Sequence, residues 1–546
     1  MRYLFIILSL TFLYSCSSSR FSKRDVRKAQ QLFGLEFDKQ YVDTMHQYLV
    51  RNLNGYDSLR KYEMPHETFP ALLFNPHPRE FRMPEIKDTF VTPTISNITL
   101  PNDLNEIAFY SIPQLAALIQ SRQITSVQLT QLYLDRLKKY NPTLQCAITI
   151  TEKLAMAQAK KADHEITNGN YKGLLHGIPY GTKDLMAVEG YKTTWGAMPY
   201  KDQQISHTAT VIKKLENAGA VLVAKLVSGA LARGDVWFGG KTKNPWDITQ
   251  GASGSSAGSG SATAAGLVAF SLGTETLGSI TSPSTRNGVS GLRPTYGVVS
   301  RDGVMSLSWS MDKVGPICRS AEDCAIVFDA IRGKDPLDAT TVNSGFAYDP
   351  NIDFSKLKIG FLEKEVNRDT TDSGDNVRNA IAMLDKIIHQ RTPIELPTNF
   401  PYHGFDVILR AEAGAMFDEL VRSGKVDVMV QQSKRSRANS LRQARFIPAV
   451  EYLQANRYRQ LLIEDIHQRF KDFDVIIAPT FGGRQLLITN LTGHPVVTVP
   501  TGFDSKGRPT SITFIGNLYQ EGLILAFANA FQKATQHHLK KPPLFP

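Results

Sequence analysis

The sequence predicts an α/β protein in which helices cover both faces of a mixed, twisted β-sheet. Short apolar runs rich in β-branched residues recur along the chain, namely "AVLVAKL" (220–226), "KIGFLE" (358–363), "DVIIAP" (474–479), "PVVTVP" (495–500) and "SITFIG" (511–516). Helical or glycine-bearing segments separate these runs, and such alternation is typical of α/β folds. No internal repeat at a fixed period is present in the sequence.

The N-terminus has the pattern of a signal peptide. The apolar run "YLFIILSLTFLY" (3–14) is about a dozen residues long, whereas a membrane span takes roughly 20. The string "LYSC" that ends at Cys16 resembles the lipobox of bacterial lipoproteins, in which the cysteine is lipidated. We therefore expect a signal peptide over 1–15, a lipid anchor on Cys16 and a place in the cell envelope, at the outer membrane. An ordinary signal peptide or an uncleaved anchor remains open.

A tether and a helical lead-in are expected next, over 16–106. The segment "RKAQQLFGLEFDKQYVDTMHQYLVRNL" (27–53) has helical periodicity, and a proline-punctuated stretch follows it. From residue 111 two amphipathic helices are predicted. The second begins with capping-box spacing between Thr125 and Gln128, and Pro142 is expected beyond its end.

The stretch "GASGSSAGSGSATAAGLVAFSLGTETLGSITSPS" (251–284) has two possible interpretations, a flexible linker or a catalytic site. A solvated linker has no reason to carry the apolar segment "AAGLVAFSLG". Ser256 lies in a G-x-S-x-G match, but no apolar strand precedes it, as a nucleophile elbow requires.

Upstream, Lys183 lies among apolar neighbours in "HGIPYGTKDL". If it is buried there, desolvation lowers its pKa and makes it a base; the alternative is a solvated surface lysine.

Composition excludes several classes of protein. The chain has 546 residues, 42% of them hydrophobic and 21% charged, which suits a globular protein with a sizeable core. Its formal net charge is +11, yet no run of five basic residues occurs, so nucleic-acid binding is not predicted. Cys146, Cys318 and Cys324 are too few for a disulfide framework and lack zinc-site spacing, so we expect buried cysteines, no metal and no cofactor.

Four segments together resemble the amidase signature family. They are "LHGIPYGTKDL", "KTKNPWDITQGASGSSAGSGSATAAGLVAFSLGTETLGSITSPS", "GVSGLRPTYGVVSRDGVMSLSWSMDKVGPICRS" and "LTGHPVVTVPTGF", in the family's order and spacing. The resemblance covers roughly 107–540 and implies the amidase signature fold for that region. The more polar, helix-rich part over 335–470 is expected to shape the substrate site.

The resemblance also implies a catalytic set. Ser279 matches the nucleophile, Ser255 matches the family's cis-serine 24 residues earlier, and Lys183 matches the lysine that accepts the proton. Backbone amides of an oxyanion hole are implied at Thr276, Leu277, Gly278 and Ser279. Supporting roles that brace the loops are expected for Asp184, Asn244, Arg286 and Asp312.

This chain departs from the family beside the nucleophile. Leu277 and Gly278 stand where many relatives have two glycines, and Thr281 stands where they have arginine. The serine loop reads "SGSSAGS" instead of the commoner "GGSSGGS". Because all three catalytic residue types are retained, we expect activity, while the altered neighbours leave the substrate preference and the oxyanion geometry open.

The function expected is hydrolysis of a carboxamide C–N bond through an acyl-enzyme on Ser279. One alternative is the glutaminase subunit of a tRNA amidotransferase, which passes ammonia to a partner; another is a noncatalytic surface-binding lipoprotein on an amidase scaffold. The expected partners are a small-molecule amide and the membrane that holds Cys16, with a homodimer as a further option. The sequence does not choose among primary amides, peptide amides, fatty acyl amides and N-acyl amino acids.

Overall fold

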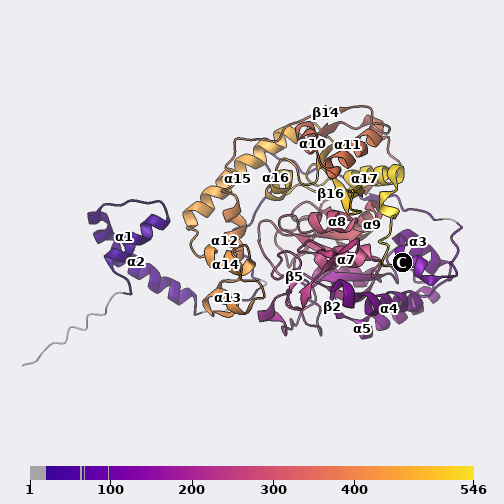
Figure 1. Cartoon of the computed structure of the whole chain (residues 1–546), viewed down its shortest axis with the longest axis horizontal. Coiled ribbons are helices and arrows are strands. Elements are labelled where there is room, and N and C mark those ends of the chain that lie inside the picture. Colours follow the sequence, from indigo (N-terminus) through magenta and orange to yellow (C-terminus); the bar gives the residue numbers. More distant parts are fainter. Residues whose placement is uncertain (1–19, 62–63, 67, 96) are drawn as a thin grey trace, which may run out of the picture. The chain divides into compact units, whose positions relative to one another are not determined.

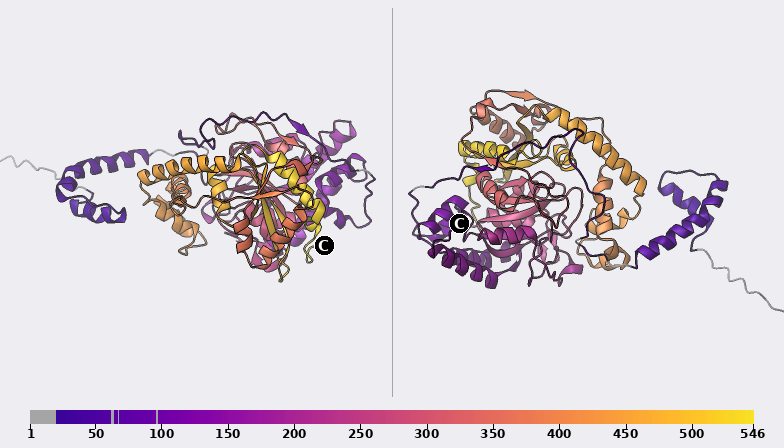
Figure 2. Two further views of the ribbon diagram at one scale, coloured as in Figure 1. Left: turned by 90° about the horizontal axis from the view of Figure 1, so that it is seen from above. Right: turned by 180° about the vertical axis from the view of Figure 1, so that it is seen from behind.

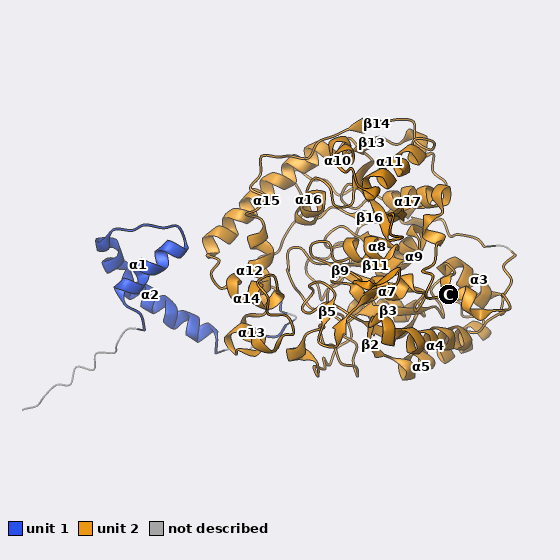
Figure 3. Cartoon of the chain, in the orientation of Figure 1, with its two compact units in different colours: residues 1–68 blue, residues 69–546 orange. Residues whose placement is uncertain are grey.

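The structure is a computed structural model that describes residues 20–61, 64–66, 68–95 and 97–546. The chain divides into two compact units, Met1–Thr68 and Phe69–Pro546 (Figures 1 and 3). The predicted signal peptide and Cys16 lie outside the described residues. No helix within the described ranges is long and apolar enough to cross a membrane.

The described part of the first unit is helical, as the periodicity predicts. Helix α1 (Lys23–Leu32) begins at Ser22, whose side chain forms a capping box with Asp25, and α2 (Lys39–Leu59) follows it. Val42 is the buried residue of these two helices. The unit therefore has little apolar core of its own.

An eleven-stranded mixed sheet organises the second unit, in the order β14-β13-β15-β17-β16-β10-β11-β9-β3-β4-β2. The apolar runs that predicted strands all form strands of this sheet, which confirms the fold class. The strands are β2 (Ala147–Ile150), β3 (Pro179–Lys183), β4 (Val221–Leu226), β9 (Phe270–Glu275), β10 (Ser290–Arg293), β11 (Lys313–Cys318), β13 (Ile359–Phe361), β14 (Arg391–Pro393), β15 (Val475–Pro479), β16 (Val496–Phe503) and β17 (Pro509–Ile515).

Helices pack on both faces of this sheet (Figure 2). The predicted capping box of α4 is present, because the Thr125 side chain accepts from the amide of Gln128. The expected end before Pro142 is wrong, since α4 runs on to Leu144. A proline in the last turn removes one hydrogen bond without forcing the next residues out of the helix. The helices are α3 (Ile112–Gln120), α4 (Ser126–Leu144), α5 (Glu152–Thr167), α6 (Thr210–Asn217), α7 (Ala257–Ala264), α8 (Thr281–Asn287), α9 (Ala321–Ile331), α10 (Glu363–Arg368), α11 (Asp372–Leu384), α16 (Gln485–Thr492) and α17 (Glu521–Thr535).

The segment 69–106, assigned from sequence to the N-terminal region, packs with the large unit instead. Its strand β1 (Thr89–Phe90) pairs in parallel with β12 (Ala347–Tyr348). The ring of Phe74 lies 3.5 Å from the guanidinium carbon of Arg459. These contacts explain the difference, because strand pairing and ring contacts across long sequence separations leave no local pattern.

Four helices of the region 335–470 form a layer that we call the cap: α12 (Asp406–Met416), α13 (Asp418–Arg422), α14 (Arg437–Ala444) and α15 (Ala449–Phe470). Apolar side chains of α12 to α14, such as Met416 and Leu441, pack against Trp195, Leu231 and Met305 of the loops above the sheet. The cap therefore closes over the loops at one edge of the central strands.

Candidate active site

Lys183 ends β3, and every residue of that strand is buried. Its Nζ lies 2.8 Å from the Ser255 Oγ and 2.8 Å from the Thr274 Oγ1. Burial lowers the pKa of Lys183 to about 7, although Asp312 and Glu275 oppose the shift. A lysine with this pKa is able to lose its proton near neutral pH, so the sequence prediction of a buried lysine, instead of a solvated one, holds.

Ser255 lies between the short strand β8 (Asp247–Gly251) and helix α7. The peptide bond between Gly254 and Ser255 is cis, the geometry that the family resemblance implies. A Cβ on Gly254 would lie 1.9 Å from the carbonyl oxygen of Gly234, so only glycine fits there. The carbonyl oxygen of Ser255 accepts from the amide of Gly229 at 3.1 Å. The loop at Gly229 to Gly234 is therefore packed directly against the serine loop.

Ser279 lies in the loop between β9 and α8 and is 8% exposed. Its carbonyl oxygen accepts from the amide of Ser256 at 3.2 Å, which joins the two serine-bearing loops. The Ser256 hydroxyl bonds the backbone of Thr274 and is thus fully engaged in structure. No described residue accepts a hydrogen bond from the Ser279 hydroxyl, so this side chain is not committed to holding the fold.

The loop Thr276–Ser279 offers a set of unused backbone donors. The amides of Leu277, Gly278 and Ser279 donate to no other residue in the described part of the chain. Gly278 has a φ of +86°, which turns the backbone sharply before the nucleophile. Leu277 is 39% exposed, so its side chain does not fill the core. The arrangement suits an oxyanion hole, in which one donor is worth about 2.7 to 4 kcal/mol in other hydrolases.

Glu275 is a functional candidate that the sequence analysis missed. Its Oε2 accepts from the amides of Ile280 and Thr281, the two residues that follow the nucleophile, at 2.9 and 2.8 Å. Its Oε1 pairs with the Arg293 guanidinium at 2.9 Å. Burial alone would raise the pKa of Glu275, but the charge of Arg293 and the hydrogen bond from the Thr281 amide bring it to about 2. The only sequence signal was an acidic residue at the end of a buried strand, four positions before Ser279.

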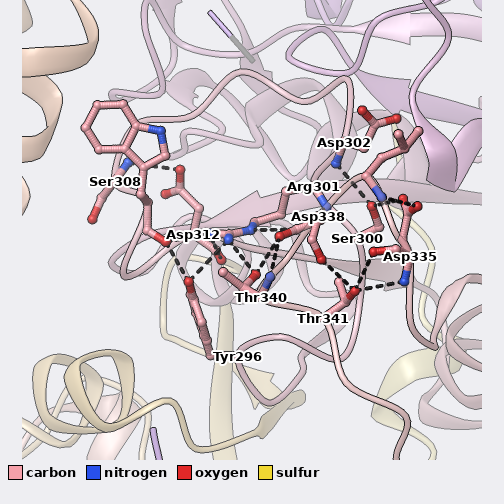
Figure 4. Close-up of polar contacts among 12 residues, drawn as sticks. Tyr296, Ser300, Arg301, Asp302, Ser308, Asp312, Asp335, Asp338, Thr340 and Thr341 are labelled. Carbon is pink, nitrogen blue, oxygen red and sulfur yellow. Dashed lines mark hydrogen bonds and ion pairs between the residues drawn. The ribbon is translucent and has the colours of Figure 1, made fainter. Parts of the chain in front are cut away.

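Asp312 braces the other side of the same loop. Its carboxylate accepts from the Thr276 hydroxyl at 2.5 Å and from the amide of Leu307 at 2.6 Å. Arg301 in turn holds the loop that carries Asp312, because its Nη1 donates to the Trp309 carbonyl at 2.7 Å (Figure 4). Burial raises the pKa of the Asp312 carboxyl. The supporting role expected for Asp312 thus has a geometric basis.

The side chains of the other three residues expected to support the site make their contacts away from the Lys183 Nζ. Asp184 forms a buried ion pair with Lys225 at 2.8 Å. Asn244 accepts from the amide of Trp246 and closes a local turn. Arg286 is exposed and donates to Gln250, so the structure does not bring it to Lys183 and the two serines.

A large cavity lies apart from these residues. It measures about 750 Å³ and lies among α8, the segment 480–483 and the turn before β17, and none of Lys183, Ser255 and Ser279 lines it. A much smaller cavity of about 10 Å³ is lined by Thr274, Thr276 and Asp312. The hydrogen bonds of Lys183 and the two serine loops therefore locate the candidate site, and cavity size does not.

Comparison with known proteins gives consistent results. The family model described as Amidase matches residues 128–488. A glutamyl-tRNA(Gln) amidotransferase subunit from Chromobacterium violaceum is 32% identical over 481 residues, covering 80% of this chain and 99% of that protein. The equivalent subunit from Carboxydothermus hydrogenoformans is 31% identical, covering 80% of this chain and 100% of that protein. The crystal structure of peptide amidase from Stenotrophomonas maltophilia superposes with a TM-score of 0.69 at 28% identity, over 79% of this chain and 98% of that one.

Proposed function

The chain belongs to the amidase family, and we propose that it cleaves the C–N bond of a carboxamide through an acyl-enzyme on Ser279. The observation that carries this proposal is the buried Lys183, whose Nζ lies 2.8 Å from the Ser255 Oγ. Ser255 and Ser279 sit on loops joined by a backbone hydrogen bond. These contacts support the assignment of Lys183 as base, Ser255 as relay and Ser279 as nucleophile.

In the proposed mechanism, protons pass between Ser279, Ser255 and Lys183. Neutral Lys183 accepts the proton of Ser255 while its own N–H groups donate to Thr274. Ser255 takes the proton of Ser279 as the Ser279 Oγ attacks the carbonyl carbon, and the oxyanion is held by the amides of the 276–279 loop. Ser255 then gives a proton to the leaving nitrogen and the C–N bond breaks. Water attacks the ester by the same route and releases the carboxylate.

A second candidate is the glutaminase subunit of a tRNA amidotransferase. The curated relatives are named as subunits of glutamyl-tRNA(Gln) amidotransferase and are 31 to 32% identical, which favours this alternative over a free-standing amidase. The chemistry is shared, because glutamine is a carboxamide whose hydrolysis releases ammonia. The two candidates differ in the substrate and in whether a partner protein receives the ammonia.

A panel of amides tests both candidates. Purified full-length protein is treated with a fluorophosphonate probe and assayed on glutamine, amino-acid amides, peptide amides and fatty acyl amides. We expect labelling of one serine and turnover of at least one amide. Glutamine turnover that rises when amidotransferase partner proteins are added would favour the second candidate; neither labelling nor turnover of any amide would refute both.

We also propose, from the sequence alone, that Cys16 is lipidated and tethers the protein to the cell envelope. Expression in a bacterium with an alkyne-bearing fatty acid tests this idea. We expect label and membrane association in the wild type and neither in Cys16→Ala. Equal recovery of both proteins in the soluble fraction, without label, would count against the anchor.

A further inference from the structure

Arg437 is the first residue of cap helix α14, and its side chain extends into a loop beside the serine site. The residue is 5% exposed. Its Nε donates to the carbonyl oxygen of Leu231 at 3.0 Å, and its Nη2 donates to that of Ala232 at 3.2 Å. Among the described residues, no carboxylate forms an ion pair with Arg437. The cap therefore uses a buried charged group to hold two adjacent backbone carbonyls.

The two residues so held have an unfavourable backbone conformation. Leu231 has a φ of +48° and Ala232 a φ of +58°, and neither is glycine. A left-handed conformation is unfavourable for an L-amino acid, because it brings the Cβ too close to the following carbonyl oxygen. Such a pair persists when its surroundings hold it. Arg437 provides that support, because it binds the carbonyl groups of both strained residues.

This loop is in direct contact with the relay serine. The amide of Gly229 donates to the carbonyl oxygen of Ser255, and the amide of Arg233 donates back to Gly229 at 3.3 Å. A Cβ on either Gly229 or Gly254 would lie 1.9 Å from the carbonyl oxygen of Gly234. Because the backbones at Gly229, Gly234 and Gly254 leave no room for independent movement, a shift of the loop at 231–232 moves the backbone of Ser255 as well.

We propose that Arg437 is a positioning residue for Ser255, and that it couples the seating of the cap to the geometry of the proton relay. The inference rests on the proposed function of Ser255. Arg437 touches neither Ser279 nor Lys183; it acts through the loop 229–234. When the cap is seated, both carbonyl bonds form and Ser255 is presented to Lys183. When α14 lifts, the strained pair can relax and the relay loses its alignment.

The charge on Arg437 strengthens this link. Burial and the neighbouring Arg233 lower the pKa of Arg437 to about 9, so the guanidinium remains charged at neutral pH. Hydrogen bonds with a charged donor are roughly twice as strong as neutral ones. Lysine would keep the charge but not the planar fork that reaches two carbonyl groups at once.

A double-mutant cycle between Arg437 and Ser255 tests the inference. The rate of fluorophosphonate labelling of Ser279 and the turnover of an amide accepted by the wild type are measured for Arg437→Met, Ser255→Ala and the double variant. We expect Arg437→Met to lower kcat about tenfold to a hundredfold with KM nearly unchanged. In the Ser255→Ala background the same substitution is expected to have almost no further effect on labelling. Arg437→Lys should fall between wild type and Arg437→Met.

Arg459 supplies the matched control. It is also a buried cap arginine that binds backbone carbonyls, but those of Leu491 and Ser310. Arg459→Met and Ser255→Ala should combine additively, which separates positioning from general loss of stability. Additive effects of Arg437→Met and Ser255→Ala would overturn the inference, and if the methionine variant does not fold, the cycle with Arg437→Lys decides. A wild type that neither labels nor hydrolyses any amide would instead remove the proposed function itself.

Discussion

Replacement of Ser279 by alanine is expected to lower amide hydrolysis by about six orders of magnitude, the size of loss seen when a serine hydrolase loses its nucleophile. This loss comes from the missing nucleophile alone. The acyl-enzyme cannot form without the Ser279 Oγ, while the oxyanion donors and Lys183 stay in place. No described residue accepts a hydrogen bond from this hydroxyl, so the fold loses little. We expect the melting temperature to stay close to that of the wild type.

The measurement is amide turnover together with fluorophosphonate labelling and a thermal melt. Ser256→Ala is the matched control, because Ser256 lies in the G-x-S-x-G match yet its hydroxyl bonds the Thr274 backbone. That variant should lose stability and retain labelling at Ser279. Loss of labelling in Ser256→Ala with full labelling in Ser279→Ala would show that Ser279 is not the nucleophile.

Local sequence patterns predicted the fold well because they reflect local physics. Apolar β-branched runs became strands, and the Thr125 capping box began α4 as expected. The contacts of the 69–106 segment were not predictable, because strand β1 pairs with β12 more than two hundred and fifty residues away. Pairing over that separation depends on the assembled fold and leaves no periodic signal in either segment.

The residues of the candidate site also divide into those that the sequence could predict and those that it could not. Lys183, Ser255 and Ser279 could be named because the motifs that resemble the family carry them. Thr274 and Glu275 could not, since a threonine and a glutamate at the end of a buried strand have no distinctive pattern. Their roles appear only when β9 is placed beside β3, so that Thr274 meets the Lys183 Nζ. The same holds for the cap arginine of α14, which depends on a helix that folds back over a loop two hundred residues earlier.

Replacement of Lys183 by methionine is expected to lower kcat/KM at neutral pH by about a thousandfold or more, because the relay then has no proton acceptor. In the wild type kcat/KM should rise with pH through about 7, the pKa of Lys183, as the amine loses its proton. The variant should lack this rise. A pH profile of the wild type that is flat from pH 5.5 to 8.5, or a variant that keeps it, would remove Lys183 from the mechanism.

The same substitution should leave stability unharmed while it removes activity. The pKa of Lys183 is about 7 in the fold against an ordinary value of 10.5, so the unfolded chain binds more protons between these limits, and this lysine's contribution to stability rises with pH from 7 to 10.5. Below pH 7 the full penalty applies, of the order of 4 to 5 kcal/mol from the shift of the pKa. Lys183→Met removes that penalty while losing two hydrogen bonds, so we expect a melting temperature at neutral pH equal to or above that of the wild type.

Lys225 is the matched control for Lys183, because it is an equally buried lysine on the adjacent strand. Its Nζ pairs with Asp184 at 2.8 Å, so Lys225→Met would leave a buried carboxylate without its partner. Breaking such a pair costs about 3 to 5 kcal/mol. We therefore expect Lys225→Met to melt well below the wild type while its remaining activity still rises through pH 7. If both variants were destabilised alike and both kept that rise, Lys183 would be a buried structural lysine with no function as a base.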